Sequence, residues 1–339
     1  MSLGTTDLIH HGDADLVPGL VDLAVNVRTG GTPAWLAERI RGTDLAAYPD
    51  QAEALKAVAA RHARTVDEVL LTAGAAEAFV LIARAVRPRH AVVVHPQFTE
   101  PEAALRNAGH DVEQIVLPYP FTLDPALIPE AADLVFVGNP TNPTSVLHAR
   151  ETLRALRRPG RLVVVDEAFA DCIPGEPESL AAQADLDGIV VLRSLTKTWA
   201  LAGLRIGYVL ASPAVIDALR AAQPLWPVSS PALTACLATA EPAALAEVDA
   251  WATDLTTGRD HLVAGLAGLP AVRLVPNPSA CFVLLDTGTP DIRIRLQHEG
   301  FAVRRGETFP GLDAGWIRVA VRNGHTTDRF VTALREVLG

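Results

Sequence analysis

Hydroxyl, amine and guanidinium groups stand close together near the middle of the chain. The apolar run 188–192 is typical of a buried strand, and Ser194, Thr196 and Lys197 follow it. Arg205 comes eight residues after the lysine. A lysine amine can form a Schiff base with an aldehyde cofactor, and hydroxyl groups with an arginine can bind a phosphate. An isolated Ser-x-x-Lys motif also fits a solvated lysine at a strand end, so its interpretation depends on the rest of the chain.

Several other short apolar runs end at residues that are suited to ligand binding. The expected strands include 69–72, 91–94, 112–116, 134–138, 162–165, 189–192 and 207–210, and most are separated by helical segments. This alternation indicates an α/β fold with a parallel sheet covered on both faces. The residues just after these strands include Gly74, Phe98, Asn142, Asp166 and Lys197. Because ligands of such sheets bind beyond the carboxyl ends of the strands, we expect these residues to converge in one cleft.

Asp166 and Lys197 together favour pyridoxal 5'-phosphate as the cofactor. The carboxylate can keep the pyridine nitrogen protonated and the amine can hold the aldehyde, so both are the expected catalytic residues. Asn142 can donate a hydrogen bond to the phenolic oxygen, and Phe98 can stack on the ring. Taken singly, Asp166 could cap a helix, Asn142 could belong to a plain turn, and Phe98 could be a core residue.

The expected phosphate site combines a helix start with side chains. Backbone N–H groups after Gly74, at Ala75 and Ala76, are free to bind an anion at the beginning of a helix. Ser194, Thr196 and Arg205 complete the expected set of phosphate ligands.

Composition limits the class of protein. The 339 residues suggest about two domains. The formal net charge is −10 and the basic residues are scattered, which argues against nucleic-acid and membrane partners. No apolar run approaches the length of a membrane span. The three cysteines are far apart, without zinc-ligand spacing, and suit a reducing cytoplasm. We therefore expect a cytoplasmic protein that binds a small molecule and no metal.

The pattern of elements predicts a division into three segments. After residue 268 the chain changes to short strands and helices. We expect a large cofactor-binding domain at 41–235 and a small C-terminal domain at 236–339. Residues 1–40 are expected to join the small domain.

The order of these motifs resembles the fold-type-I pyridoxal-phosphate enzymes, the aspartate aminotransferase superfamily, over nearly the whole chain. The resemblance implies a mostly parallel central sheet covered by helices and a smaller C-terminal α/β domain. Tyr48-Pro49-Asp50 is similar to a segment that in this family reaches the cofactor phosphate of the partner subunit, which implies a homodimer with shared active sites. The motifs that carry the resemblance are Asn142-Pro143-Thr144, Asp166-Glu167-Ala168, Ser194-Leu195-Thr196-Lys197 and Gly203-Leu204-Arg205.

Two branches of the family resemble the chain most, histidinol-phosphate aminotransferase and the threonine-phosphate decarboxylase of cobalamin synthesis. Phe169 favours the decarboxylase, because most aminotransferases carry a tyrosine there. The other favouring features are the segments His11-Gly12-Asp13, Leu192-Arg193-Ser194-Leu195-Thr196-Lys197, and Pro310-Gly311-Leu312-Asp313 followed by Arg318-Val319-Ala320-Val321-Arg322.

The same resemblance implies the substrate contacts. Arg318 is expected to hold the substrate carboxylate, with Arg304 and His11 near a substrate phosphate. An arginine suits both anions because its guanidinium binds them bidentately. Asn26 and Asn142 complete the expected substrate-binding residues.

We therefore expect a lyase that converts L-threonine O-3-phosphate to (R)-1-aminopropan-2-yl phosphate in cobalamin biosynthesis. The alternative is an aminotransferase similar to histidinol-phosphate aminotransferase, because the broken Cα bond depends on a geometry that sequence does not report. A second alternative is a pyridoxal-phosphate-binding regulatory protein without catalysis. A nicotinamide-dependent dehydrogenase is excluded, because no Gly-x-Gly-x-x-Gly motif follows the first strand.

Overall fold

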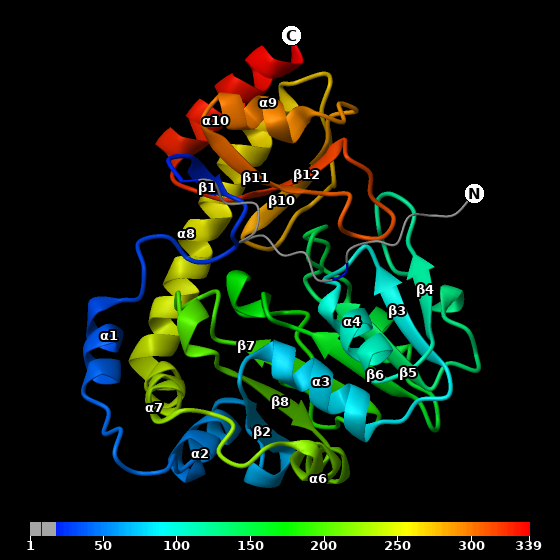
Figure 1. The fold of residues 1–339 in the computed structure, drawn as a ribbon, viewed down its shortest axis with the longest axis vertical. Helices are drawn as coiled ribbons and strands as arrows, with labels where there is room; N and C mark the ends of the chain where they lie inside the picture. Colours follow the sequence, from blue (N-terminus) through cyan, green and yellow to red (C-terminus); the bar gives the residue numbers. More distant parts are fainter. Residues whose placement is uncertain (1–7, 9–17) are drawn as a thin grey trace.

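Two β-sheets, one in the lower and one in the upper part of Figure 1, organise the molecule. The computed structural model describes residue 8 and residues 18–339. The long helix α8 (Pro242–Ala267), yellow in Figure 1, runs between the two parts.

The lower sheet has seven strands in the order β2-β8-β7-β6-β5-β3-β4. Only β8 runs antiparallel to its neighbours, so the sheet is mostly parallel, as expected. Each strand begins and ends within two residues of its predicted range. Apart from β4, which is partly exposed, the strands are apolar runs that fit a strand buried on both faces. The strands are β2 (Val69–Thr72), β3 (Ala91–His95), β4 (Val112–Val116), β5 (Leu134–Gly138), β6 (Leu162–Asp166), β7 (Ile189–Ser194) and β8 (Gly207–Ala211).

Helices cover both faces of this sheet, since alternate strand residues point to opposite sides. On one face, Leu70, Phe136 and Val190 pack into a core with α3 (Ala75–Ala85), α4 (Glu100–Asn107) and α6 (Pro213–Ala222). On the other face, the core joins the intervening strand residues to four helices. These are α1 (Ala34–Arg41), α2 (Ala52–Arg61), α5 (Arg150–Arg154) and α7 (Ser230–Thr239).

The upper sheet has five strands in the order β1-β11-β12-β10-β9. Its helices are α8, α9 (Ile292–His298) and α10 (Gly324–Leu338), which share a core with its strands. The strands are β1 (Val21–Leu23), β9 (Arg273–Leu274), β10 (Phe282–Asp286), β11 (Phe301–Arg305) and β12 (Trp316–Ala320).

Strand β1 is the element that the sequence does not predict. It has three residues and pairs in parallel with β11, near the other end of the chain. Such a short strand exists only through this distant partner, so local sequence carries no signal for it.

The expected fold class is confirmed: the chain is a mixed α/β protein with a mostly parallel central sheet. The division at residues 40 and 235 stays a prediction. Among the described residues, no helix is both long enough and apolar enough to cross a membrane.

Candidate active site

A cavity of about 430 Å³ opens at the carboxyl ends of β3, β5, β6 and β7. These strands are parallel neighbours, so their ends meet at one edge of the sheet. Most of the predicted site residues line this cavity. They are Asn26, Ala75, Ala76, Phe98, Asn142, Asp166, Ser194, Thr196, Lys197, Arg205 and Arg318.

Lys197 lies in the loop that follows β7, with its amine facing the cavity. Burial lowers the pKa of this amine, and the positive charges of Arg318 and Arg205 lower it further. The backbone around it is fixed, because Arg28 N–H donates to the Lys197 carbonyl at 2.9 Å. The site therefore favours a neutral, nucleophilic amine more than an exposed lysine would.

Asp166 is the last residue of β6 and faces the same cavity. Burial raises the pKa of its carboxyl group to about 6, although the Ala168 N–H donates to Oδ1 at 3.0 Å and Lys197 adds a favourable charge. A buried carboxylate without a counter-charge is unfavourable, and a protonated ring nitrogen would supply that charge. This donor set fits the pyridine end of pyridoxal phosphate.

Gly74 forms a cradle at the start of α3. Its φ of +79° is in the left-handed region, and a Cβ at this position would lie 2.6 Å from Nη2 of Arg205. Arg205 itself has a φ of +55°, a conformation that non-glycine residues adopt mainly where the surrounding structure enforces it. The guanidinium thus lies against the first turn of α3, where backbone N–H groups are free to bind an anion.

Gly207, the first residue of β8, allows the end of β7 to lie close to the N-terminus of α3. Gly207 on β8 pairs with Thr72 on one side and with Ser194 on the other. A Cβ there would lie 2.6 Å from the Arg193 carbonyl oxygen and 3.2 Å from the Ala75 nitrogen. Glycine at this position therefore lets the hydroxyl of Ser194 lie near the N-terminus of α3, as a phosphate site requires.

Arg318 reaches the cavity from β12 of the other sheet. Its Nη1 donates to Oδ1 of Asn142 at 2.5 Å, across 176 residues of sequence. With the Asn26 amide turned so that its oxygen faces the guanidinium, that oxygen accepts from Nε and Nη1 at 3.1 Å each. The side chain also donates to the Ala24 carbonyl and lies over the Phe282 ring at 5.2 Å. These contacts fix the orientation of the guanidinium before any ligand arrives.

Four predicted residues do not line this cavity. Gly74 directly precedes the lining residues Ala75 and Ala76. Tyr48 is 76% exposed, and its ring stacks on Trp226 with centroids 4.3 Å apart. Arg304 is buried and pairs with Arg318 in the register of β11 and β12, where its guanidinium lies over Phe309 at 5.0 Å. His11 lies outside the described residues.

Several cavity residues were missed by the sequence reasoning. Gln97 is buried, and its Nε2 has no hydrogen-bond partner among the described residues. Its position directly before Phe98, after a strand end, is a signal that could have found it. Phe169 was expected only as a marker of the decarboxylase branch, and it lines the cavity with its ring centre 6.0 Å from the Lys197 amine. The remaining missed residues are Ala24, Val25, Val27, Pro101, Gly138, Pro140, Ala168 and Ala202.

The chain belongs to the class I and II aminotransferases, whose family pattern matches residues 18–337. A histidinol-phosphate aminotransferase of Mycobacterium tuberculosis is 51% identical over 330 residues, which cover 95% of this chain and 90% of that protein. The threonine-phosphate decarboxylase of Salmonella typhimurium is 31% identical over 336 residues, covering 94% and 91%. The structure of histidinol-phosphate aminotransferase from Sinorhizobium meliloti in complex with pyridoxal-5'-phosphate aligns with a TM-score of 0.82 at 21% identity, covering 94% and 90%.

Membership of this family confirms two predictions. The chain is a pyridoxal-phosphate-dependent enzyme, and pyridoxal 5'-phosphate is its cofactor. The roles of the individual cavity residues stay predictions.

The expected threonine-phosphate decarboxylation is wrong. The chain shares 51% identity with a histidinol-phosphate aminotransferase but 31% with the decarboxylase. Two of the features that favoured decarboxylation lie away from the cavity. Arg193 is buried in a cluster of carboxylates, and residues 310–313 do not line the cavity. Phe169 and Arg318 do line it.

Gly74→Ala should weaken cofactor binding at least tenfold, because the new Cβ would meet Nη2 of Arg205 at 2.6 Å. Titration of the cofactor-free protein with pyridoxal phosphate measures the dissociation constant. Gly109→Ala is the matched control, since Gly109 also has a positive φ, +87°, but no atom lies within 4 Å of its added Cβ. Equal affinities in the two variants would refute the phosphate cradle.

Asp166→Asn should stabilise the cofactor-free protein at pH 8. The pKa of Asp166 is about 6 in the folded state, against about 4 in an unfolded chain, so folding favours the protonated carboxyl and stability is lost as pH rises through 6. The amide cannot ionise, and we expect a gain of about 2 kcal/mol at pH 8 that shrinks toward pH 4, allowing for screening by solvent in the cavity. Denaturant unfolding at the two pH values measures it, and a loss of stability at pH 8 would contradict the assignment.

Proposed function

We propose that the chain transfers an amino group between histidinol phosphate and 2-oxoglutarate. The observation that carries this proposal is the 51% identity, over 95% of the chain, to a histidinol-phosphate aminotransferase. A small phosphorylated amino compound also agrees with the position of Arg304, because Arg304 is the strand neighbour of Arg318, which lines the cavity.

The cavity residues fit the three functional ends of the cofactor. Pyridoxal phosphate, when bound, supplies an electron sink for negative charge at the substrate Cα. Asp166 would hold the ring nitrogen, and the cradle of Gly74, Ser194, Thr196 and Arg205 would hold the phosphate. Asn142 accepts a hydrogen bond from Arg318 through its oxygen, so its amide nitrogen is the atom left to donate to the phenolic oxygen.

Lys197 is the proposed base. Because burial lowers its pKa, the amine is more readily deprotonated than an exposed lysine, and the neutral amine can take a proton from Cα of the substrate. Once protonated, the same amine can act as the general acid that gives the proton back within the cavity. Its fixed backbone and the ring of Phe169, whose centre lies 6.0 Å away, limit where the amine can reach.

Arg318 is the proposed site for the carboxylate of glutamate and 2-oxoglutarate. Its guanidinium is held by Asn26, Asn142 and the Ala24 carbonyl, so little side-chain entropy is lost when a carboxylate binds. Contact of Arg304 and His11 with the substrate phosphate remains a prediction.

An exposed apolar surface supports the proposal of a homodimer. Leu45, Tyr48, Leu225 and Trp226 are 74%, 76%, 80% and 51% exposed, and two of their side chains stack on each other. Exposed apolar groups gathered in this way are typical of protein interfaces. A second copy of the chain is the proposed occupant, with Tyr48 reaching the cofactor phosphate of the partner subunit.

A cytoplasmic location is the remaining part of the proposal. The three cysteines are buried and free of disulfides. Free thiols of this kind suit a reducing compartment.

The purified enzyme should form glutamate from 2-oxoglutarate when histidinol phosphate is supplied, and should release no carbon dioxide from threonine phosphate. Lys197→Ala should reduce turnover by about 100- to 10,000-fold, because proton transfer at Cα loses its base. Lys56→Ala is the matched control, since Lys56 is exposed and paired with Glu53. Absence of glutamate, or full activity in Lys197→Ala, would refute the proposal.

The combined variant Tyr48→Ala and Trp226→Ala should shift the protein from dimer to monomer. The substitutions remove the stacked pair from the proposed interface, which weakens association by loss of buried apolar area. Sedimentation velocity should give twice the 35.9 kDa of the chain for the wild type and a single chain mass for the variant. Tyr48→Phe keeps the ring and should stay dimeric, whereas a monomeric wild type would contradict the proposal.

A further inference from the structure

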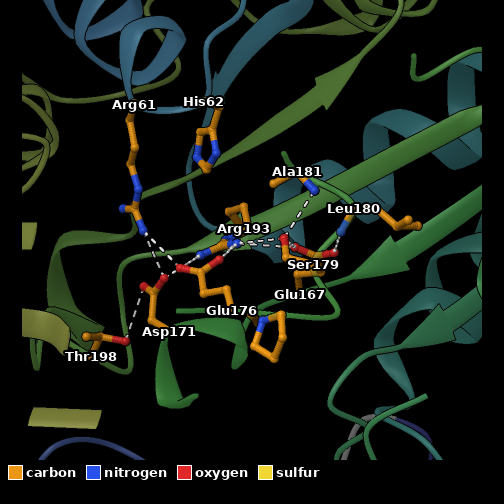
Figure 2. Close-up of polar contacts among 12 residues, drawn as sticks. Arg61, His62, Glu167, Asp171, Glu176, Ser179, Leu180, Ala181, Arg193 and Thr198 are labelled. Carbon is orange, nitrogen blue, oxygen red and sulfur yellow. Dashed lines mark hydrogen bonds and ion pairs between the residues drawn. The ribbon is translucent and has the colours of Figure 1, made fainter. Parts of the chain in front are cut away.

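A cluster of charged side chains, drawn in Figure 2, lies at the carboxyl ends of β6 and β7. The guanidinium of Arg193 occupies its centre, with the carboxylates of Glu167, Asp171 and Glu176 around it. Arg61 from α2 supplies the second cation, with Nη2 at 3.0 Å from Asp171 and 3.4 Å from Glu176. We call these five residues the ionic cluster.

Arg193 contacts all three carboxylates of the ionic cluster. Its Nη1 lies 3.2 Å from Glu167 and 2.5 Å from Glu176. Its Nη2 lies 2.9 Å from the other oxygen of Glu176 and also donates to Asp171. The side chain of Arg193 is 2% exposed, and its bonds to three carboxylates hold the guanidinium in one orientation.

Members and ligands of the ionic cluster are the immediate neighbours of the proposed catalytic residues. Glu167 follows Asp166, and Arg193 precedes Ser194. Thr198 follows Lys197, and its hydroxyl donates to Asp171 at 3.3 Å. Because successive side chains of a strand point to opposite sides, Glu167 and Arg193 hold the ends of β6 and β7 from behind while Asp166 and Ser194 face the cavity. Thr198 lies in the turn after β7 and ties that turn to Asp171.

Two groups outside the ionic cluster also hold Glu167. The Ser179 hydroxyl and the Leu180 N–H each donate to Glu167 at 2.6 Å. Apolar residues of similar volume often stabilise a core as well as a buried ion pair does. Stability alone is therefore a weak account of three carboxylates and two guanidinium groups placed at this edge.

We propose that Arg193 is a positioning residue, which aligns the segments that carry Asp166, Ser194 and Lys197 for cofactor binding. One guanidinium links the end of β6, the end of β7 and, through Asp171 and Thr198, the loop that carries Lys197. Lysine in place of arginine keeps the charge but cannot reach all three carboxylates with a rigid fork. The segments would then lose their common anchor.

The test compares two buried arginines at opposite ends of the sheet. Arg161 directly precedes β6 and donates to the carbonyls of Ala132, Leu156, Pro129 and Glu130. Arg161 and Arg193 are 4% and 1% exposed. Arg161, however, lies at the opposite end of β6 from Asp166. Arg161→Lys is thus a control for the loss of a buried guanidinium.

Arg193→Lys should weaken binding of pyridoxal phosphate at least tenfold, and should shift the pH midpoint of the absorbance of the bound cofactor. Arg161→Lys should lower the melting temperature of the cofactor-free protein by at least as much, yet bind the cofactor within twofold of wild type. Equal losses of affinity in the two variants, or wild-type affinity in Arg193→Lys, would overturn the inference.

A second pair of variants covers the case in which Arg193→Lys does not fold. Thr198→Val removes one hydrogen bond to Asp171 at nearly constant volume, and should weaken cofactor binding severalfold. Thr198→Ser keeps the hydroxyl and should restore wild-type affinity. Equal affinity of the valine and serine variants would count against the inference.

The inference rests on the proposed roles of Asp166 and Lys197, and the same titrations separate the two failures. Failure of the wild type to bind the cofactor, or unchanged binding and activity in Lys197→Ala, removes the proposed function. If the wild type binds the cofactor and Lys197→Ala loses activity, but Arg193→Lys keeps wild-type affinity, only the positioning role is refuted.

Discussion

The withdrawal of two oppositely charged groups from water at one edge of the sheet governs this structure. Burial lowers the pKa of Lys197 and raises the pKa of Asp166, so each group is held in an environment that disfavours its charged form. Neither shift is useful to folding. Both make sense when the cavity receives a ligand that reacts with an amine and carries a positive ring nitrogen.

The fold produces this arrangement through topology. Parallel strands place their carboxyl ends side by side, so residues far apart in sequence face one cavity. Gly74 and Gly207 then allow the start of α3, the side chain of Arg205 and the end of β7 to approach closely. The second sheet closes the cavity with Arg318, which is already oriented by Asn26 and Asn142.

Much of this could be predicted from the sequence, because the signals are local. Continuous apolar runs define the strands of the large sheet, and the residues after them line the cavity. What could not be predicted depends on distant partners. Strand β1 exists only against β11, and the contact of Arg318 with Asn142 joins the two sheets. The ionic cluster likewise gathers residues from α2, β7 and the loop after β6, none of which has a local pattern of its own.

The error about the reaction has the same origin. The segment around Arg193 resembles a marker of one branch of the family, but its side chain points into the ionic cluster and not toward a substrate. Similarity at such a position reflects the ion pairs that hold the strand ends in place. Substrate choice depends on groups that line the cavity, and sequence does not give their distances.

The central claim is that the amine of Lys197 holds the cofactor, and the composition of the chain makes this directly testable. The sequence contains two lysines, Lys56 and Lys197, and only Lys197 lines the cavity. The measurement is borohydride reduction of the enzyme in the presence of pyridoxal phosphate, followed by peptide mass spectrometry. The account predicts one pyridoxyl group, on the peptide that carries Lys197. A label on Lys56 alone, or no label on a protein that still turns over, would contradict it.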